Sequence, residues 1–260
     1  MTVARRSTPR RCTARRTCSP VVQYTINGYP RELEAAVIDY SRSVATLKQI
    51  SEEFGPKAVV WSYDPILISS LTPPEHHLES FAALARALSG WVDEVVVSFA
   101  HFYQKTRGNL TVAAREAGFT FDDPQVEQKQ HLLTTLVHMA VDHGMRLSIC
   151  SQRAFLVPGA AEAQCVDARR LEAVGAKKIT APVAGNREDC ECFQSKDIGE
   201  YNTCPHGCVY CYAVQNRGLA QDRFRRHDPE SDFLFEPPPG AHEVKPRQGV
   251  LSLPLLTRKE

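Results

Sequence analysis

The 260-residue sequence lacks several features that would assign it to a familiar class. It has no apolar run near the roughly 20 residues that a membrane-spanning helix needs, and no signal peptide with an apolar core. It has no glycine-rich cofactor-binding motif and no internal repeat of fixed period. The formal net charge is only +1, so the total charge indicates no partner. We therefore expect a cytoplasmic protein that does not bind membranes.

One asymmetry of charge lies at the start of the chain. Residues 1–20 contain six arginines and no acidic residue. A basic arm can bind nucleic acid, but here no aromatic residue interleaves with the arginines and they show no periodicity. We expect this stretch to be a disordered or misassigned start. No apolar segment follows the paired arginines, which argues against a twin-arginine export signal.

Short β-type runs alternate with amphipathic helical patterns from residue 21 onward, which predicts repeated βα units and a parallel sheet. Strands are expected at residues 21–26, 58–61, 92–99, 146–149 and, more weakly, 177–181. Helices are expected at residues 33–54, 72–88, 124–143 and 166–174. The second of these helices is expected to begin with a capping box at Thr72 to Glu75. Residues 101–109 are expected to form a polar loop.

This pattern predicts an α/β fold: a partial (β/α) barrel of the TIM type with a cysteine-rich, loop-dominated C-terminal cap. The expected organisation is a basic start at 1–20, a βα-repeat domain at 21–182, a metal-cluster segment at 183–216 and a partly disordered extension at 217–260. Ligands of parallel α/β sheets gather beyond the carboxyl ends of the strands. Asp64, the loop around His101 and Cys150 are therefore expected to open onto one face.

Three cysteines form the strongest chemical pattern of the sequence, a CxxxCxxC motif at Cys204, Cys208 and Cys211. Three thiolates at this spacing can bind three irons of a 4Fe-4S cluster, which usually takes four cysteine ligands. The remaining iron is then open to a substrate, a cofactor or a more distant ligand. The motif therefore predicts an iron-sulfur protein.

Four further cysteines precede this triad: Cys150, Cys165, Cys190 and Cys192. Four thiolates suit a second closed cluster or a tetrahedral zinc site, although Cys190 or Cys192 could instead supply a fourth ligand to the first cluster. Cys150 and Cys165 could also be ordinary buried thiols. Disulfides are a weaker explanation, because clustered cysteines in cytosolic proteins more often bind metal.

The triad, with Tyr210 directly before its last cysteine, resembles the cluster motif of radical S-adenosylmethionine enzymes. From residue 23 to about 216 the chain also resembles an uncharacterised bacterial family, a domain of unknown function with a radical-SAM-like cysteine cluster at its C-terminus. The segments that carry this second resemblance are Tyr24–Pro30, Tyr63–Pro65, Phe102–Tyr103 with Lys105 and Thr106, Ile149–Ser151, Gln164–Asp167, Cys190–Cys192 and Asp197–Ala213.

Two features depart from these resemblances. Radical-SAM proteins place the cluster loop after the first barrel strand, whereas this triad lies near the end of the chain. Members of the closer family usually begin with additional strand and helix segments, which the residues before Val21 do not match. We therefore expect a truncated or misassigned start and only four or five βα units.

The resemblance implies reductive cleavage of S-adenosylmethionine to a deoxyadenosyl radical, which abstracts a hydrogen from a substrate. It implies that the triad binds the cluster, that Tyr210 and Tyr212 shield it and contact adenine, and that Gly207 permits a tight loop. Asp64 is the candidate catalytic residue, holding polar groups of cofactor or substrate, although an aspartate before Pro65 can equally be a turn residue. An electron donor such as a flavodoxin or ferredoxin is the expected partner.

Three other functional classes stay open. The first class is a non-catalytic protein in which an iron-sulfur cluster or a zinc ion only stabilises a loop-rich cap. The second class is a DNA-repair lyase of the spore-photoproduct type, in which a basic run near the end of the chain would contact DNA. A solvated, charged helix end also explains this run. The residues of that run are Arg217, Arg223, Phe224, Arg225 and Arg226. A plain electron-transfer protein is the third class, which the large βα portion makes unnecessary.

Overall fold

The computed structural model describes residues 20–230. These residues divide into two compact units: unit 1 contains residues 20–198 and 206–212, and unit 2 contains residues 199–205 and 213–230. The predicted basic start and most of the predicted C-terminal extension lie outside the described residues. No helix within residues 20–230 is both long enough and apolar enough to span a membrane.

Unit 1 is built on five parallel strands whose order in the sheet follows their order in the chain. They are β1 (Val22–Thr25), β2 (Val59–Ile66), β3 (Glu94–Phe99), β4 (Arg146–Ile149) and β5 (Ala161–Glu162). The central strands β2 and β3 are almost wholly buried, which explains their continuous runs of valine and aromatic residues. The predicted α/β fold with a parallel sheet is confirmed.

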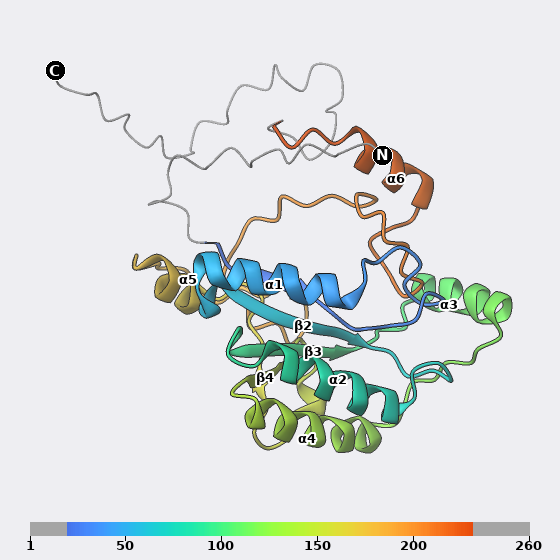
Figure 1. The fold of residues 1–260 in the computed structure, drawn as a ribbon, viewed down its shortest axis with the longest axis horizontal. Helices are drawn as coiled ribbons and strands as arrows, with labels where there is room; N and C mark the ends of the chain where they lie inside the picture. The colour runs from blue at the N-terminus through green and yellow to red at the C-terminus, as the bar shows by residue number, and fades with distance from the viewer. Residues whose placement is uncertain (1–19, 231–260) are drawn as a thin grey trace. The chain divides into compact units, whose positions relative to one another are not determined.

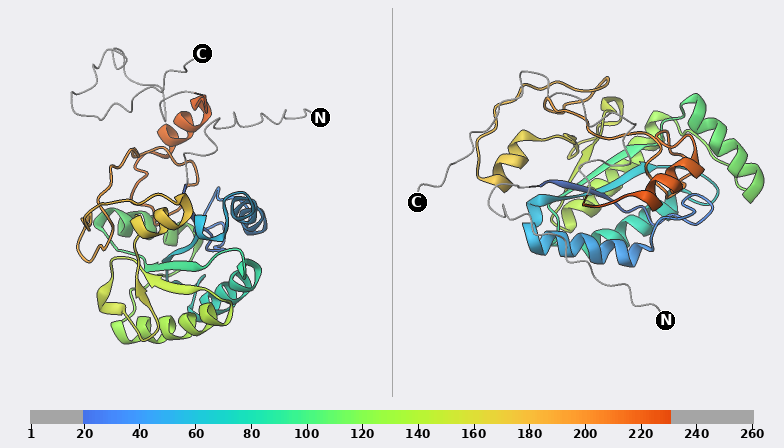
Figure 2. Two further views of the ribbon diagram at one scale, coloured as in Figure 1. Left: turned by 90° about the vertical axis from the view of Figure 1, so that its left-hand side faces the viewer. Right: turned by 90° about the horizontal axis from the view of Figure 1, so that it is seen from above.

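Helices α1, α2 and α4 lie along one face of this sheet (Figure 1). The elements between the strands are α1 (Tyr40–Phe54), η1 (Pro56–Ala58), α2 (Pro74–Leu88), α3 (Gln104–Ala117), α4 (Val126–Asp142) and η2 (Arg153–Phe155), and α5 (Ala168–Gly175) follows β5. Fully buried side chains of the main core include Leu47, Trp61, Phe81, Leu88, Val95, Leu133 and Leu136. Burying each large apolar side chain contributes roughly 1.5–3 kcal/mol, so this face holds the sheet and helices together. Figure 2 shows the helices around the strands from two further sides.

The opposite face of the sheet carries smaller side chains. They are Val60, Ser62, Val96, Ser98 and Ser148. A buried ionic network crosses this face, in which the Ser148 hydroxyl donates to Glu94 (2.6 Å) and the Arg170 guanidinium of α5 pairs with the same carboxylate (2.6 Å). Arg170 also pairs with Asp93 (2.8 Å). The network ties α5 to the amino-terminal end of β3.

Three predicted elements differ at their starts or ends. Helix α1 begins at Tyr40 and not near Leu33, because Asp39 caps it by accepting from the Ser41 N–H (2.9 Å). Strand β2 continues to Ile66, beyond the predicted end. The predicted capping box at the start of α2 is wrong, since the Thr72 hydroxyl instead donates to a backbone carbonyl, that of Leu67 (2.7 Å).

Two predicted elements are wrong outright. The stretch expected as a polar loop, residues 101–109, contains the first turns of α3. Its buried side is narrow, with only Thr106 and Leu110 fully buried, so its apolar periodicity is weak. The weak strand expected at 177–181 is absent from the described structure, and the fifth strand is the two-residue β5 instead.

Unit 2 is a loop packed on one helix, α6 (Arg217–Arg226). The Asn216 side chain caps the helix by accepting from the Leu219 N–H (2.9 Å), and Asn202 Oδ1 accepts from the Asn216 N–H (2.8 Å). The basic side chains of α6 make local contacts: Arg223 donates to the Tyr201 carbonyl (2.6 Å), and Arg225 pairs with an aspartate of the same helix. Part of the predicted extension is therefore a capped helix.

Candidate functional site

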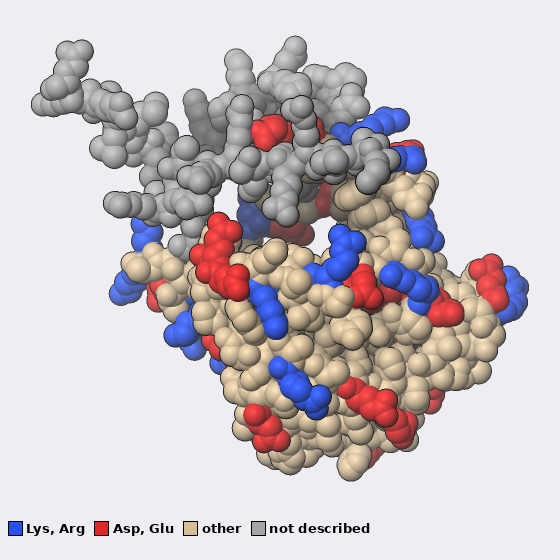
Figure 3. All heavy atoms as spheres, in the orientation of Figure 1, with Lys and Arg blue, Asp and Glu red and all other residues tan. Residues whose placement is uncertain are grey.

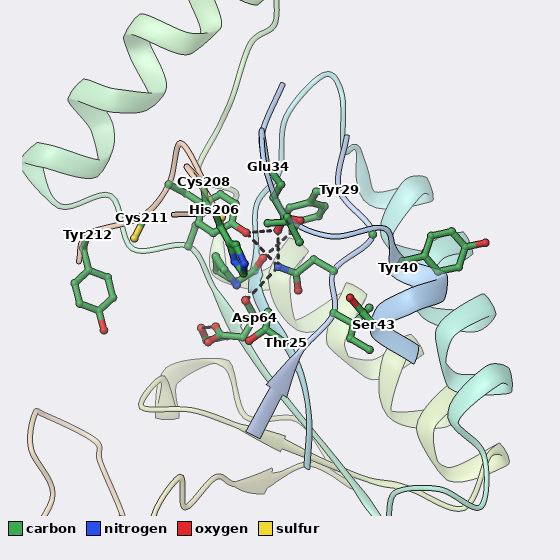
Figure 4. Close-up of a pocket in the computed structure, with 18 of the residues that line it drawn as sticks. Thr25, Tyr29, Glu34, Tyr40, Ser43, Asp64, His206, Cys208, Cys211 and Tyr212 are labelled. Atoms are coloured by element: carbon green, nitrogen blue, oxygen red, sulfur yellow. Dashed lines mark hydrogen bonds between the residues drawn. The ribbon is translucent and has the colours of Figure 1, made fainter. Parts of the chain in front are cut away.

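A cavity of about 750 Å³ lies at the carboxyl ends of β1, β2 and β3 in unit 1. Figure 4 shows Glu34, Asp64, His206 and Cys208 around it. A volume of roughly 300–1,000 Å³ is typical of pockets for small molecules and cofactors. The cavity occupies the edge of the sheet where parallel α/β proteins bind their ligands.

The segment 206–211 forms one wall of this cavity because it pairs with the chain after β1. The Ala36 N–H donates to the His206 carbonyl (2.9 Å), and the Val209 N–H donates to the Leu33 carbonyl (3.0 Å). These bonds flank an isolated antiparallel bridge between residues 34 and 208. Segment 206–211 is therefore fixed by backbone hydrogen bonds to residues 33–36, in the loop between β1 and α1.

Two cysteines of the predicted triad lie on this wall, Cys208 and Cys211. The Cys211 N–H donates to the Cys208 carbonyl (3.1 Å), so a tight turn brings both side chains to the cavity. Gly207 has φ of 69°, a left-handed conformation that favours glycine, as expected for a tight loop. Cys204 belongs to unit 2. Within residues 20–230 no three His, Cys, Asp or Glu side chains are grouped so that they hold a metal ion.

A buried hydrogen-bond network connects the cysteine loop to the loop after β1. The Tyr210 hydroxyl donates to Glu34 Oε1, and Asn27 Nδ2 lies 3.2 Å from the same oxygen. Asn27 Nδ2 also lies 3.2 Å from the Asp64 carbonyl oxygen, whereas its own Oδ1 is buried with no hydrogen-bond partner. An unsatisfied buried acceptor is costly, so Asn27 Oδ1 is a ready partner for a ligand donor.

Burial controls protonation in this network. Burial raises the pKa of the Glu34 carboxyl, while the hydrogen bonds from Tyr210 and Asn27 favour the carboxylate and oppose the rise. Burial and then the nearby Glu34 charge raise the pKa of the Tyr210 phenol well above its usual value. Tyr210 is therefore a hydrogen-bond donor at neutral pH. Its ring packs edge-on against Tyr29, with 6.0 Å between the ring centroids.

Replacing Tyr210 by phenylalanine is expected to lower the free energy of unfolding by roughly 1–3 kcal/mol, because the buried Glu34 carboxyl loses a donor while the ring contact with Tyr29 is kept. Urea denaturation at pH 7 measures the change. Tyr40→Phe is the matched control, since Tyr40 also lines the cavity but is 56% exposed, and it should change stability by less than about 0.5 kcal/mol. Equal losses in the two variants would contradict the role assigned to the Tyr210 hydroxyl.

Asp64 lies within β2, on the cavity, and not in the turn that its position before a proline allowed. The Ser98 hydroxyl of β3 donates to its Oδ1. Burial raises the pKa of the Asp64 carboxyl, against lowering contributions from Ser98 and then from the charges of Arg187 and His101. His101, which follows β3, lies 3.1 Å from the Gln152 side chain (Nε2 to Nε2), and burial lowers the pKa of its imidazole.

The other four cysteines form two close pairs in unit 1. Cys150, directly after β4, has its Sγ 3.6 Å from that of Cys165, and Cys190 and Cys192 interact through their thiols. The hydrogen bond from Cys165 lowers the pKa of the Cys150 thiol to about 6, and Arg187 Nη2, 3.1 Å from Cys150 Sγ, acts in the same direction. The predicted convergence of Asp64, the His101 loop and Cys150 is thus observed in part: the first two line the cavity, and Arg187 links Cys150 to it.

Tyr212 and three residues not predicted as site residues complete the cavity. Tyr212 is 57% exposed, packs edge-on against Tyr103 at 6.4 Å between ring centroids, and accepts at its carbonyl from Lys105 Nζ (3.1 Å). Asn27, Glu34 and Arg187 line the cavity without having been predicted. Asn27 lies two residues after the end of β1, and a polar residue at that place is a usable signal in the sequence. Glu34 and Arg187 lie in loops without a motif.

The fold and this cavity define an α/β protein with a ligand-sized pocket beyond the carboxyl ends of a parallel sheet. Residues 10–213 match the family described as "Domain of unknown function (DUF1848)", and the chain belongs to that family. The expected membership of a domain family of unknown function is confirmed. No curated protein and no solved structure matches the chain.

Proposed function

We propose that Cys204, Cys208 and Cys211 bind a 4Fe-4S cluster and that the protein is a radical-SAM-like enzyme. The observation that carries the proposal is the position of Cys208 and Cys211 on the wall of a cavity of about 750 Å³. Thiolate donors at this spacing suit iron of a cluster, and a triad leaves one iron without a protein ligand. We further propose that the Cys204 thiol comes close enough to Cys208 and Cys211 to bind the same cluster.

The chain's own residues would bind and orient the ligands of this cavity. A cluster held by Cys204, Cys208 and Cys211 would supply one electron for the reductive cleavage of S-adenosylmethionine, the chemistry that generates a hydrogen-abstracting radical. Asn27 Oδ1 offers an acceptor to an amino or hydroxyl group, and the Asp64 carboxyl offers a second one. Arg187, at the same cavity, offers charge to a carboxylate. Tyr103 and Tyr212 offer exposed rings for stacking on a planar group.

The proposed fold is a partial (β/α) barrel. Its support is the strand order, in which each strand neighbours the next one in the chain, as in a TIM barrel. A doubly wound sheet would reverse its order at a switch point. We propose a flavodoxin or ferredoxin as the electron donor.

Anaerobic reconstitution of the full-length protein with iron and sulfide tests this proposal. We expect a brown protein with about four irons per chain. After reduction, adding S-adenosylmethionine should change the electron paramagnetic resonance spectrum and release 5′-deoxyadenosine, detected by mass spectrometry. The Cys211→Ala variant, treated identically, is the blank for both signals.

Two results would overturn the proposal. A colourless protein that retains only zinc would identify a metal staple without redox chemistry. A brown protein whose spectrum does not respond to S-adenosylmethionine, and which releases no deoxyadenosine above the blank, would identify a structural or electron-transfer cluster.

Lys and Arg are interspersed with Asp and Glu among the described residues on the face drawn in Figure 3, so that face offers no support for the nucleic-acid alternative.

A further inference from the structure

Four thiols from three separate segments lie close together at the carboxyl end of β4. Cys150 directly follows β4, Cys165 follows β5, and Cys190 and Cys192 belong to the loop at residues 182–195. Cys150 and Cys192 are buried, at 6% and 4% exposed, and none of the four is in a disulfide. Four buried or half-buried thiols in one place are more than packing requires, since a single small apolar residue would fill each position.

Contacts connect all four of these thiols. The Cys150 and Cys165 sulfurs are 3.6 Å apart, and the Ser151 hydroxyl contacts both Cys150 (3.7 Å to Sγ) and Cys190. Cys190 in turn interacts with Cys192, whose charge acts on Cys165. The two pairs are therefore neighbours in one cluster.

The distance between the Cys150 and Cys165 sulfurs distinguishes the kinds of metal centre. Two thiolates bound to one tetrahedral zinc ion, each at about 2.3 Å, are separated by roughly 3.8 Å. In a 4Fe-4S cluster each cysteine binds a different iron, so the sulfurs lie farther apart. A disulfide needs about 2.05 Å between its sulfurs. The observed 3.6 Å fits the edge of a zinc tetrahedron.

The loop around Cys190 and Cys192 is shaped to present its sulfurs. A Cβ atom at Gly185 would lie 2.1 Å from the Cys190 carbonyl oxygen, so only glycine permits this turn. The Val166 N–H points at Cys192 Sγ (3.4 Å), and backbone N–H groups also hydrogen-bond Cys190. Donors of this kind stabilise thiolates. The Phe193 N–H donates to the Val166 carbonyl (2.9 Å), which anchors the loop beside Cys165.

We propose that Cys150, Cys165, Cys190 and Cys192 bind one zinc ion that ties the loop at 182–195 to the carboxyl end of β4. Zinc with four thiolates carries a net charge of −2, and the Arg187 guanidinium, 3.1 Å from Cys150 Sγ, compensates part of it. Because no three of these thiols are grouped to hold a metal ion in the described structure, the proposal requires the two pairs to close on the ion by a change of cysteine rotamer. Because Arg187 also lines the large cavity, the zinc fixes one charged group of that cavity.

Zinc content of the full-length protein, purified without added metal and measured by plasma mass spectrometry, tests this site. We expect about one zinc per chain in the wild type and in Cys208→Ala, and less than a fifth of that in Cys190→Ser and Cys165→Ser. X-ray absorption at the zinc edge should give four sulfurs at about 2.3 Å. Limited proteolysis should cut within residues 182–195 in Cys190→Ser and not in the wild type.

Circular dichroism shows whether the variants fold, and titration of the wild type with a mercurial thiol reagent gives an independent readout. Release of one zinc for about four blocked thiols supports the site. Three results would overturn the zinc site: no zinc in the wild type, zinc content unchanged in both Cys190→Ser and Cys165→Ser, or nitrogen or oxygen ligands at the zinc. So would a Cys150–Cys165 disulfide in protein purified under argon. These outcomes are independent of iron and of cofactor cleavage, so the proposed function can fail separately.

Discussion

Cys208→Ala is expected to reduce the iron content of the reconstituted protein from about four atoms per chain to fewer than one. The cluster has only three protein ligands in the proposed site, so the loss of one leaves two thiolates and an iron exposed to solvent. The substitution keeps the backbone bridge between residues 34 and 208, which does not involve the side chain of Cys208. The fold of the cysteine loop should therefore survive. Iron and sulfide assays on anaerobically handled protein measure the result.

Cys190→Ala is the matched control for this experiment, because Cys190 belongs to unit 1, as Cys208 does, but is not one of the three triad cysteines. It should retain about four irons. Retention of iron in Cys208→Ala would contradict the triad as the cluster site. Loss of iron in Cys190→Ala as well would assign the fourth ligand of the cluster to the other cysteine group, which is the alternative that the sequence left open.

The strands and the main helices could be predicted because their apolar patterns are continuous and strong. Strand β4 lies where the pattern places it, and helix α4 begins two residues after the Asp123-Pro124 signal. Helix α3 could not be found in this way, because only two of its residues are fully buried. The two-residue β5 is too short to leave any alternating pattern.

Candidate site residues could be predicted where their spacing suggests a chemistry, and they could not be predicted where only packing brings them together. The motif CxxxCxxC can be read directly from the sequence, and two of its cysteines line the cavity. The role of Glu34 depends on a buried hydrogen bond from Tyr210, 176 residues away. Leu33 next to it fitted a helical pattern, yet it is buried in a loop beside Tyr29. Such long-range contacts leave no periodic signal in the sequence.

A buried histidine of α2, His77, makes the stability of the protein sensitive to acid. Its side chain is fully buried, with Nδ1 2.9 Å from the Tyr63 hydroxyl and Nε2 3.1 Å from the Leu67 carbonyl oxygen. A carbonyl only accepts, so Nε2 carries the hydrogen and Nδ1 accepts from Tyr63. The ring is thus neutral, and both of its nitrogens are hydrogen-bonded.

Burial lowers the pKa of the His77 imidazole from 6.5 to about 4, and the neighbouring His76 acts in the same direction. Between these two values the unfolded chain binds a proton that the folded protein does not, so stability is full above pH 6.5 and falls as the pH drops towards 4. The loss relative to pH 7.5 amounts to about 2 kcal/mol at pH 5 and about 3 kcal/mol at pH 4. The raised pKa values of Glu34 and Asp64 act in the opposite direction.

Comparing the wild type with His77→Gln isolates the histidine, because the contributions of the two carboxyls are common to both proteins. The glutamine keeps an amide donor for the Leu67 carbonyl but has no titrating ring. Urea denaturation at pH 7.5 and pH 5 should show the wild type losing about 2 kcal/mol more than the variant between the two conditions. The variant will be less stable at pH 7.5, which does not affect the difference. If both proteins lose the same free energy, the folded protein accommodates a protonated His77, and the neutral buried ring described above is incorrect.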